Sequence, residues 1–350
     1  MRQLILISAK PSQLSRAGFL FGRSDILNAY KKTAVLVVSF GTTHLDALEH
    51  AIRNVESKIE AKVAPIPVFR AFTSNRVIAS LKKNHGIEIK KPLEAIKSLI
   101  DLGYTRIVIQ SLHVIPGFEF EKLQRDVRIA SHKRDITIQL GRPLLSRHED
   151  YLELIDALEA EVLKDMNSDG VLWMGHGTEH PANSSYVYLE RLWRVRRDNV
   201  HLVNIEGYPE LHNILPDLKG RYKSLHVYPL LIVAGDHAKN DMAGDEDSLK
   251  TALEQEGIEV RAVLSGLGNL EGIADLFANR VLAMLSKPIE GYMKSPMGIE
   301  TESFRMIEAE LKEIYSPVSF ESTLHQSVVF RAIHTRSEEH TSELQSRHNL

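Results

Sequence analysis

The sequence has no cysteine, little net charge and no long apolar run. Without cysteine there is no disulfide, no thiolate nucleophile and no cysteine-based zinc or iron–sulfur site. A net charge of −3 gives no electrostatic attraction to nucleic acid or to an anionic membrane. No apolar stretch reaches the roughly 18 residues of a membrane helix, and Leu4–Ile7 is too short for a signal-peptide core. We therefore expect a cytoplasmic protein with neither a nucleic-acid nor a membrane partner.

The composition is that of a globular protein. Hydrophobic residues make up 43% of the chain and charged residues 25%, and 350 residues are enough for about two domains. Because cysteine is absent, a protein-bound metal must be held by histidine, aspartate or glutamate, and the 16 histidines supply candidates.

Short apolar segments alternate with helical patterns from residue 31 onward. In the first half, strands are predicted at Ala34–Phe40, at the segment ending Phe69–Ser74, at Ile107–Ile115 and at Thr137–Leu140. Helical patterns separate them, and one of these starts with Pro92 in its first turn. Strands that alternate with helices favour a parallel sheet covered by helices on both faces.

The second half repeats this pattern. Strands are predicted at Val171–Met174, His201–Ile205, Leu225–Val233 and Val260–Leu264, and a terminal helix at Ile273–Leu285. The repeat predicts an α/β fold with two similar Rossmann-like lobes and a ligand cleft between them.

The predicted boundaries follow from the repeat. Lobe 1 comprises residues 31–145 and lobe 2 residues 146–286, with residues 1–30 as an N-terminal extension. Lys287 and Pro288 follow the last helical pattern and mark its end, because proline is unfavourable inside a helix.

The segment Val171–Ser185 carries the strongest local signal. A buried strand is expected to stop at Gly175-His176-Gly177, where the two glycines allow a sharp turn and leave the backbone open to a ligand. His176 then lies at the carboxyl end of a strand, where open α/β sheets bind their ligands. An ordinary turn with a surface histidine explains the same pattern.

Three candidate metal ligands follow three strands of lobe 2: His176, Glu206 and His237. The carboxyl ends of parallel strands lie at one edge of a sheet, so we expect these side chains to converge. Two imidazoles and a carboxylate suit cobalt, nickel, iron or zinc. Each residue taken alone has a structural explanation: His176 as part of a turn, Glu206 as a helix cap and His237 as part of a polar loop. Only the three together indicate a metal site.

Six ordered segments carry a family resemblance: SFGTT, RAFTS, QSLHVIPGFEFEKL, MGHGTEHPAN, NIEGYPE and YPLLIVAGDHAKNDMAGDE. Together they resemble the anaerobic sirohydrochlorin cobaltochelatases, two-lobed class II chelatases of cobalamin (vitamin B12) biosynthesis, over about residues 31–286. The resemblance implies an enzyme that inserts cobalt(II) into sirohydrochlorin, with the metal as substrate and no organic cofactor. It implies that His176, Glu206 and His237 bind the metal and that His176 and His237 are catalytic. We also expect a homo-oligomer.

The implied chemistry fits these residue types. Metal insertion removes two pyrrole protons, and a neutral histidine is a suitable acceptor near pH 7. The substrate carries eight carboxylates, so cationic or hydrogen-bonding side chains should line the cleft. The candidates for binding the tetrapyrrole are Ser39, Thr42, Thr43, Arg70 and Lys239. The alternative for each of these side chains is a solvent-exposed position at the rim of the cleft, without a role in binding.

The chain after residue 286 resembles a different enzyme. Residues 287–335 are similar to the start of precorrin-8X methylmutase, whose catalytic histidine falls on His334, but the stretch is too short for that activity. An amphipathic helix packed on the chelatase is the alternative. Residues 336–350 resemble translated sequencing-adapter sequence and are expected to be disordered.

Two other functions remain open. Nitrogen and oxygen ligands bind iron and nickel as well as cobalt, so a chelatase for either metal on the same tetrapyrrole fits the ligand set. A non-catalytic protein that binds a tetrapyrrole or a metal, built like a periplasmic binding protein, also has two lobes and a cleft. An anaerobic assay with sirohydrochlorin and each metal separates these functions.

Overall fold

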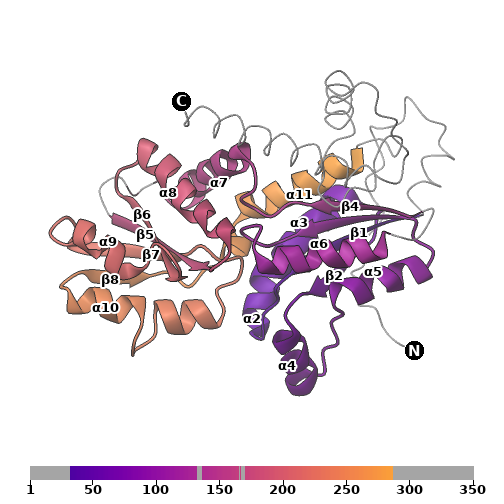
Figure 1. Ribbon diagram of the computed structural model, residues 1–350, viewed down its shortest axis with the longest axis horizontal. Coiled ribbons are helices and arrows are strands. Elements are labelled where there is room, and N and C mark those ends of the chain that lie inside the picture. Colours follow the sequence, from indigo (N-terminus) through magenta and orange to yellow (C-terminus); the bar gives the residue numbers. More distant parts are fainter. Residues whose placement is uncertain (1–31, 132–135, 165, 167–169, 287–350) are drawn as a thin grey trace, which may run out of the picture. The chain divides into compact units, whose positions relative to one another are not determined.

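The computed structural model describes residues 32–131, 136–164, 166 and 170–286, which contain two four-stranded parallel sheets. The strands of the first sheet are β1 (Thr33–Ser39), β2 (Val68–Phe72), β3 (Arg106–Ser111) and β4 (Thr137–Gly141). Those of the second are β5 (Gly170–Gly177), β6 (Val200–Glu206), β7 (Ser224–Pro229) and β8 (Glu259–Ala262). The strand orders, β2-β1-β3-β4 and β6-β5-β7-β8, are equivalent, which confirms the predicted repeat and α/β fold (Figure 1).

Helices connect the strands in both lobes. Those of the first half are α2 (Leu45–Ala47), the π-helix η1 (Leu48–Ile52), α3 (Arg53–Val63), α4 (Asn75–His85), α5 (Pro92–Asp101) and α6 (Phe118–Ala130). Those of the second half are α7 (His148–Glu161), η2 (Pro181–Asn183), α8 (Ser184–Arg196), α9 (Leu211–Leu218), the π-helix η3 (Ala238–Met242), α10 (Leu249–Gln255), η4 (Leu267–Asn269) and α11 (Glu271–Ser286). None of the helices in the described ranges is long and apolar enough to span a bilayer.

Strand β1 shows why both faces of the first sheet are covered. Val35 and Val37 pack in the core that contains α3 and α11, whereas Leu36 and Val38 pack in the core that contains α5 and α6. Alternate side chains of a strand point to opposite faces, and all seven residues of β1 are buried. A strand that is apolar on both faces belongs in the middle of a parallel sheet.

Helix α11 departs from the predicted lobe boundary. We expected it in lobe 2, but it packs against α3, β3 and β4 of the first lobe as well as α7. Its Arg280 donates to the carbonyl oxygens of Pro143 (3.0 Å) and Leu144 (3.2 Å) and to Asp150 Oδ1 (2.9 Å). The chain therefore returns to the first lobe after completing the second sheet, and this helix ties the two lobes together.

Several boundaries also differ from the sequence prediction. Strand β3 ends at Ser111, and β7 at Pro229, four residues earlier than expected in each case, because the chain leaves the sheet to line a cavity. Helices α7 and α9 were not predicted separately. The predictions for residues 1–30, 287–335 and 336–350 lie outside the described residues.

Candidate functional site

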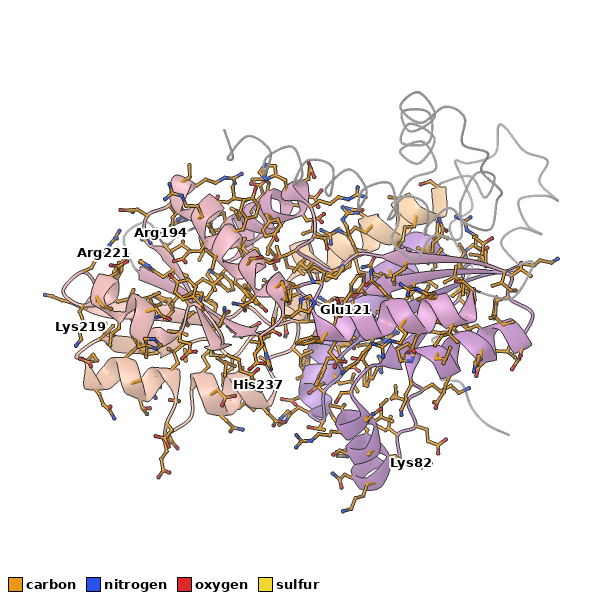
Figure 2. All side chains as sticks on the ribbon, in the orientation of Figure 1. Lys82, Glu121, Arg194, Lys219, Arg221 and His237 are labelled. Atoms are coloured by element: carbon orange, nitrogen blue, oxygen red, sulfur yellow. The ribbon has the colours of Figure 1, made fainter. Side chains whose placement is uncertain are left out.

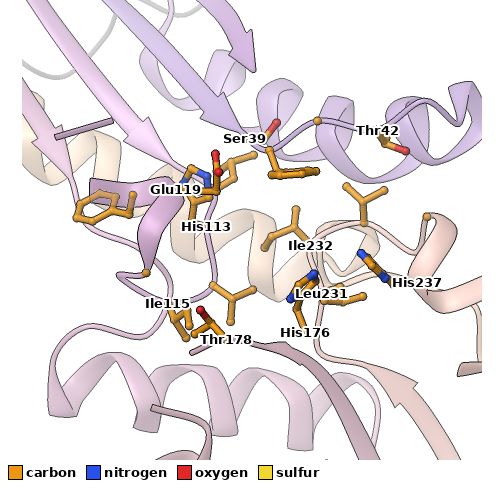
Figure 3. A pocket seen from close by; sticks show the side chains of 18 of the residues that line it. Ser39, Thr42, His113, Ile115, Glu119, His176, Thr178, Leu231, Ile232 and His237 are labelled. Atoms are coloured by element: carbon orange, nitrogen blue, oxygen red, sulfur yellow. The ribbon is translucent and has the colours of Figure 1, made fainter. Parts of the chain in front are cut away.

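A cavity of about 560 Å³ lies between the two lobes, where the strands of both sheets end (Figure 3). Apolar side chains from both lobes form much of its wall. The polar residues that line it are Ser39, Thr42, Thr43, His113, Glu119, His176, Thr178, Tyr186, Glu206, Asp236 and His237. The site thus combines an apolar enclosure with a few placed polar groups, as small-molecule sites usually do.

His176 reaches the cavity from the end of β5. We predicted that this strand ends at Met174. It continues to Gly177, which pairs with Glu206 of β6. His176 Nδ1 lies 2.9 Å from the carbonyl oxygen of Gly177. Since a carbonyl oxygen only accepts, Nδ1 carries the proton and donates, and the lone pair is on Nε2.

The two flanking glycines also have a role in packing that the sequence did not predict. A Cβ on Gly177 would lie 1.6 Å from the carbonyl oxygen of Glu206, and one on Gly175 would lie 2.5 Å from Asn204 Oδ1. Gly177 also has a φ of 74°, which side chains disfavour. The glycines therefore allow β6 to approach β5 closely, and Gly177 also lines the cavity.

His237 enters the same wall from the loop after β7. Its ring centroid lies 4.7 Å from that of His176, with the ring planes at 87° (Figure 3). Its Nδ1 is 2.6 Å from Asp241 Oδ2 in the π-helix η3. The carboxylate accepts the Nδ1 proton, so His237 also has its lone pair on Nε2. A carboxylate behind a histidine in this way orients the ring and strengthens it as a metal ligand.

Glu206, at the end of β6, lines the cavity with both histidines. Asn183 links its loop to the loop after β5: Asn183 Oδ1 accepts from the backbone N–H of Thr178 at 3.1 Å, and Nδ2 donates to the carbonyl oxygen of Tyr208 at 2.6 Å. The three predicted ligands therefore share one cavity. Within the described part of the chain, however, no three histidine or acidic side chains form a group tight enough to hold a metal ion.

The predicted tetrapyrrole-binding residues separate into two groups. Ser39, Thr42 and Thr43 line the cavity. Lys239 does not line it and lies beside the lining, with Nζ 3.3 Å from His44 Nδ1.

Arg70 is a correction to the sequence prediction, because it does not line the cavity. Its Nε donates to Glu56 Oε1 at 2.6 Å, and Nη2 pairs with Oε2 of the same, completely buried, carboxylate. Arg70 lies within β2, two residues before its end, on a face covered by α3. Its guanidinium group binds Glu56 and does not face the cavity.

The sequence reasoning missed two residues on the lobe 1 wall, His113 and Glu119 (Figure 3). His113 Nδ1 lies 2.8 Å from Ser111 Oγ, while its Nε2 is shielded from solvent and has no hydrogen-bond partner among the described residues. Burial lowers the pKa of His113 to about 4, against the opposing charge of Glu119. His113 is therefore neutral at pH 7.

The pKa of Glu119 is lowered as well, but here the neighbouring groups outweigh burial. Burial would raise its pKa, but the hydrogen bond and charge of Lys122 lower it below the ordinary value. Glu119 follows β3 as His237 follows β7, so the predicted repeat was the signal that marks this position.

The fold is of the chelatase type found in SirB. The structure of SirB from Bacillus subtilis with Fe3+ matches 73% of this chain and 96% of its own, with a TM-score of 0.52 and 15% identity, which shows the shared fold alone. Residues 33–286 match the family described as cobalt chelatase (CbiK), and the chain belongs to this family.

Two relatives are more similar in sequence. The sirohydrochlorin cobaltochelatase of Salmonella typhimurium is 38% identical over 261 residues, which are 74% of this chain and 98% of the relative. The sirohydrochlorin cobaltochelatase CbiKC of Nitratidesulfovibrio vulgaris is 35% identical over 263 residues, 73% of this chain and 91% of the relative. The aligned part of this chain thus covers nearly the whole of both relatives.

Proposed function

We propose that this protein is a sirohydrochlorin cobaltochelatase, which inserts cobalt(II) into sirohydrochlorin and releases two protons in cobalamin biosynthesis. Membership of the cobalt chelatase family supports this activity. The observation that carries the proposed site is the pair His176 and His237, whose rings are in contact on one wall of the cavity between the lobes. Both have the Nδ1 proton fixed by an acceptor, which leaves Nε2 as the metal-binding atom.

His176 and His237 receive cobalt(II), and Glu206 supplies the third ligand. Two neutral imidazoles and a carboxylate leave coordination positions open, as a site that must release its metal requires. The same histidines are the proposed catalytic residues: as the metal passes to the ring nitrogens, an imidazole freed from it accepts a pyrrole proton. Glu206 lines the cavity but is not gathered with the histidines into a compact ligand group, so it joins them when the metal is present.

The apolar wall provides the place for the macrocycle. Phe40, Val114 and Ile115 of the first lobe and Leu231 and Ile232 of the second contribute apolar surface to the cavity. Burial of the flat ring between them removes water from the metal and strengthens each polar contact inside. Ser39, Thr42 and Thr43 are the proposed polar contacts of the macrocycle on the first lobe.

The same donors accept iron(II) or nickel(II), because metals of this series share nitrogen and oxygen ligands and differ in affinity and supply. Selectivity for cobalt is the part of the proposal that needs direct measurement. A homo-oligomer and the absence of an organic cofactor stay predictions.

The test is anaerobic insertion with purified protein, sirohydrochlorin and each metal in turn, followed by the absorbance change of the macrocycle. Cobalt should react fastest, and His176→Ala should abolish the reaction while the thermal midpoint stays near that of the unmodified protein. The matched control is His212→Ala, at a histidine whose side chain is 72% exposed. Near-normal turnover by His176→Ala refutes the proposed site, and sirohydrochlorin binding without insertion of any metal refutes the enzyme.

A further inference from the structure

The described residues that line the cavity include no lysine or arginine. The proposed substrate nevertheless carries eight carboxylates, and a carboxylate placed in an apolar site without a partner is costly. The hydroxyls of Ser39, Thr42 and Thr43 in the lining are too few for eight carboxylates, so we expect further hydrogen-bond donors beside the lining. Two histidines outside the proposed metal site, His44 and His180, lie there, and each bridges the two lobes.

His44 follows β1 and contacts the loop after β7. Its Nε2 lies 2.7 Å from Asp236 Oδ1, and its Nδ1 lies 3.3 Å from Lys239 Nζ. An ammonium group only donates, so Nδ1 accepts and the proton of the neutral ring is on Nε2. His44 therefore offers a fixed N–H donor, and Asp236 accepts it.

His180 makes the matching contact from the loop after β5. Its Nδ1 accepts the backbone N–H of Ala182 at 3.0 Å, so its Nε2 carries the proton and donates to Glu121 Oε1 at 3.1 Å. Its ring also meets Phe118 edge-on, with centroids 4.8 Å apart. Glu121 belongs to α6 of the first lobe (Figure 2).

The two contacts are related by the internal repeat. The backbone N–H of His44 donates to Thr42 Oγ1, and that of His180 donates to Thr178 Oγ1, both at 3.1 Å. In each pair the histidine is the shielded member and the carboxylate the exposed one. Side-chain exposure is 28% for His44 and 68% for Asp236, and 15% for His180 and 52% for Glu121. The donor is held in place, while the acceptor can move into solvent.

We propose that His44 and His180 bind two peripheral carboxylates of the tetrapyrrole, and that Asp236 and Glu121 occupy these two positions until the substrate arrives. This inference rests on the proposed function. Exposed carboxylate pairs contribute little free energy, so replacing one carboxylate by another costs little. The exchange also releases both contacts between the lobes, so substrate entry and loss of these contacts occur together. The macrocycle has carboxylates around its whole edge, so His44 of the first lobe and His180 of the second can each bind one.

Substitutions of Glu121 and His180 should change the affinity for sirohydrochlorin in opposite directions. The affinity is measured by absorbance titration without metal. Glu121→Gln removes the competing carboxylate and should tighten binding about two- to fivefold. His180→Phe keeps a ring against Phe118 but removes the donor, and should weaken binding about tenfold. His180→Gln, which restores a side-chain N–H, should recover most of this loss. The matched control is Glu88→Gln, since Glu88 is an exposed carboxylate paired with Lys82 on the surface.

A purely structural contact predicts that loss of either partner weakens binding. Weaker or unchanged binding by Glu121→Gln therefore overturns the proposal, and so does unchanged binding by His180→Phe. If His180→Phe does not fold, Glu121→Gln decides alone, because its side chain is exposed. Cobalt affinity should stay unchanged in all these variants. Insertion by His176→Ala would refute the metal site and leave the opposite effects at Glu121 and His180 standing.

Discussion

The buried, neutral His113 should make the folded protein less stable in mildly acidic solution. Burial lowers the pKa of His113 to about 4, whereas a histidine in the unfolded chain has a pKa near 6.5. As the pH falls below about 6.5, the unfolded chain binds a proton that the folded protein does not, so the folded state loses relative stability. The contribution is complete above this pH and is lost as the pH falls toward 4.

The magnitude follows from the gap between the two values. They differ by roughly 2.5 pH units, and at about 1.4 kcal/mol per unit the loss between pH 7 and pH 4 is on the order of 3 kcal/mol. His201 adds a similar term, because burial and the charges of Arg194 and Arg221 lower its pKa to about 4 as well. His201 is present in both the unmodified protein and a variant substituted only at position 113. Its contribution therefore cancels when their free energies of unfolding are compared.

The assay is urea unfolding of the unmodified protein and His113→Asn at pH 7.0, 5.5 and 4.5. Asparagine retains a polar group near Ser111 but does not titrate, so the variant should lose less stability between pH 7.0 and 4.5, by about 2–3 kcal/mol. His212→Asn, at an exposed side chain, is the control and should behave like the unmodified protein. The same pH dependence in His113→Asn and the unmodified protein would refute the reasoning.

Three further predictions concern the site, the joint between the lobes and the C-terminal segment. Glu206→Gln should weaken cobalt binding at least about tenfold in a calorimetric titration, because it removes the anionic ligand at nearly constant size; unchanged affinity would assign Glu206 to the protein scaffold. Asp150→Ala should lower the free energy of unfolding by about 3–5 kcal/mol in urea titration, since it removes the buried carboxylate that pairs with the buried Arg280; a loss below 1 kcal/mol would contradict this. Deletion of residues 287–350 should preserve cobalt insertion, because Arg106 already binds the last carbonyl oxygens of α11 at Met284 (2.9 Å) and Leu285 (3.0 Å); an inactive truncation would show that the chelatase lobes need the segment.

The architecture was predictable because it depends on patterns within short windows. Buried parallel strands are continuous apolar runs, and the same order of motifs in both halves implied the same sheet twice. The helix α11 was not placed correctly because its periodicity shows an apolar face but not the surface that covers it. Arg280 and its acceptors lie more than a hundred residues apart in sequence, so no local pattern joins them.

The site was predictable in part for a similar reason. His176 and Glu206 lie at the carboxyl ends of strands and His237 follows one, and the common direction of parallel strands was enough to bring them to one cavity. Arg70 failed because its role depends on a partner: Glu56 of α3 lies over the same face of β2 and binds the guanidinium. His113 was missed because nothing in the local sequence marks it as buried.

Four histidines around the cavity differ in the group that contacts Nδ1, and this difference matches the two roles proposed for them. His176 and His237 have acceptors at Nδ1, a carbonyl and a carboxylate oxygen, so each presents the Nε2 lone pair that a metal needs. His44 and His180 have donors at Nδ1, an ammonium and a backbone N–H, so each presents an Nε2 proton suited to a carboxylate. In sequence all four histidines lie at the end of a strand or shortly after it. The group that reaches Nδ1 makes them different, and so metal and macrocycle can be held in one cavity without competing for the same nitrogens.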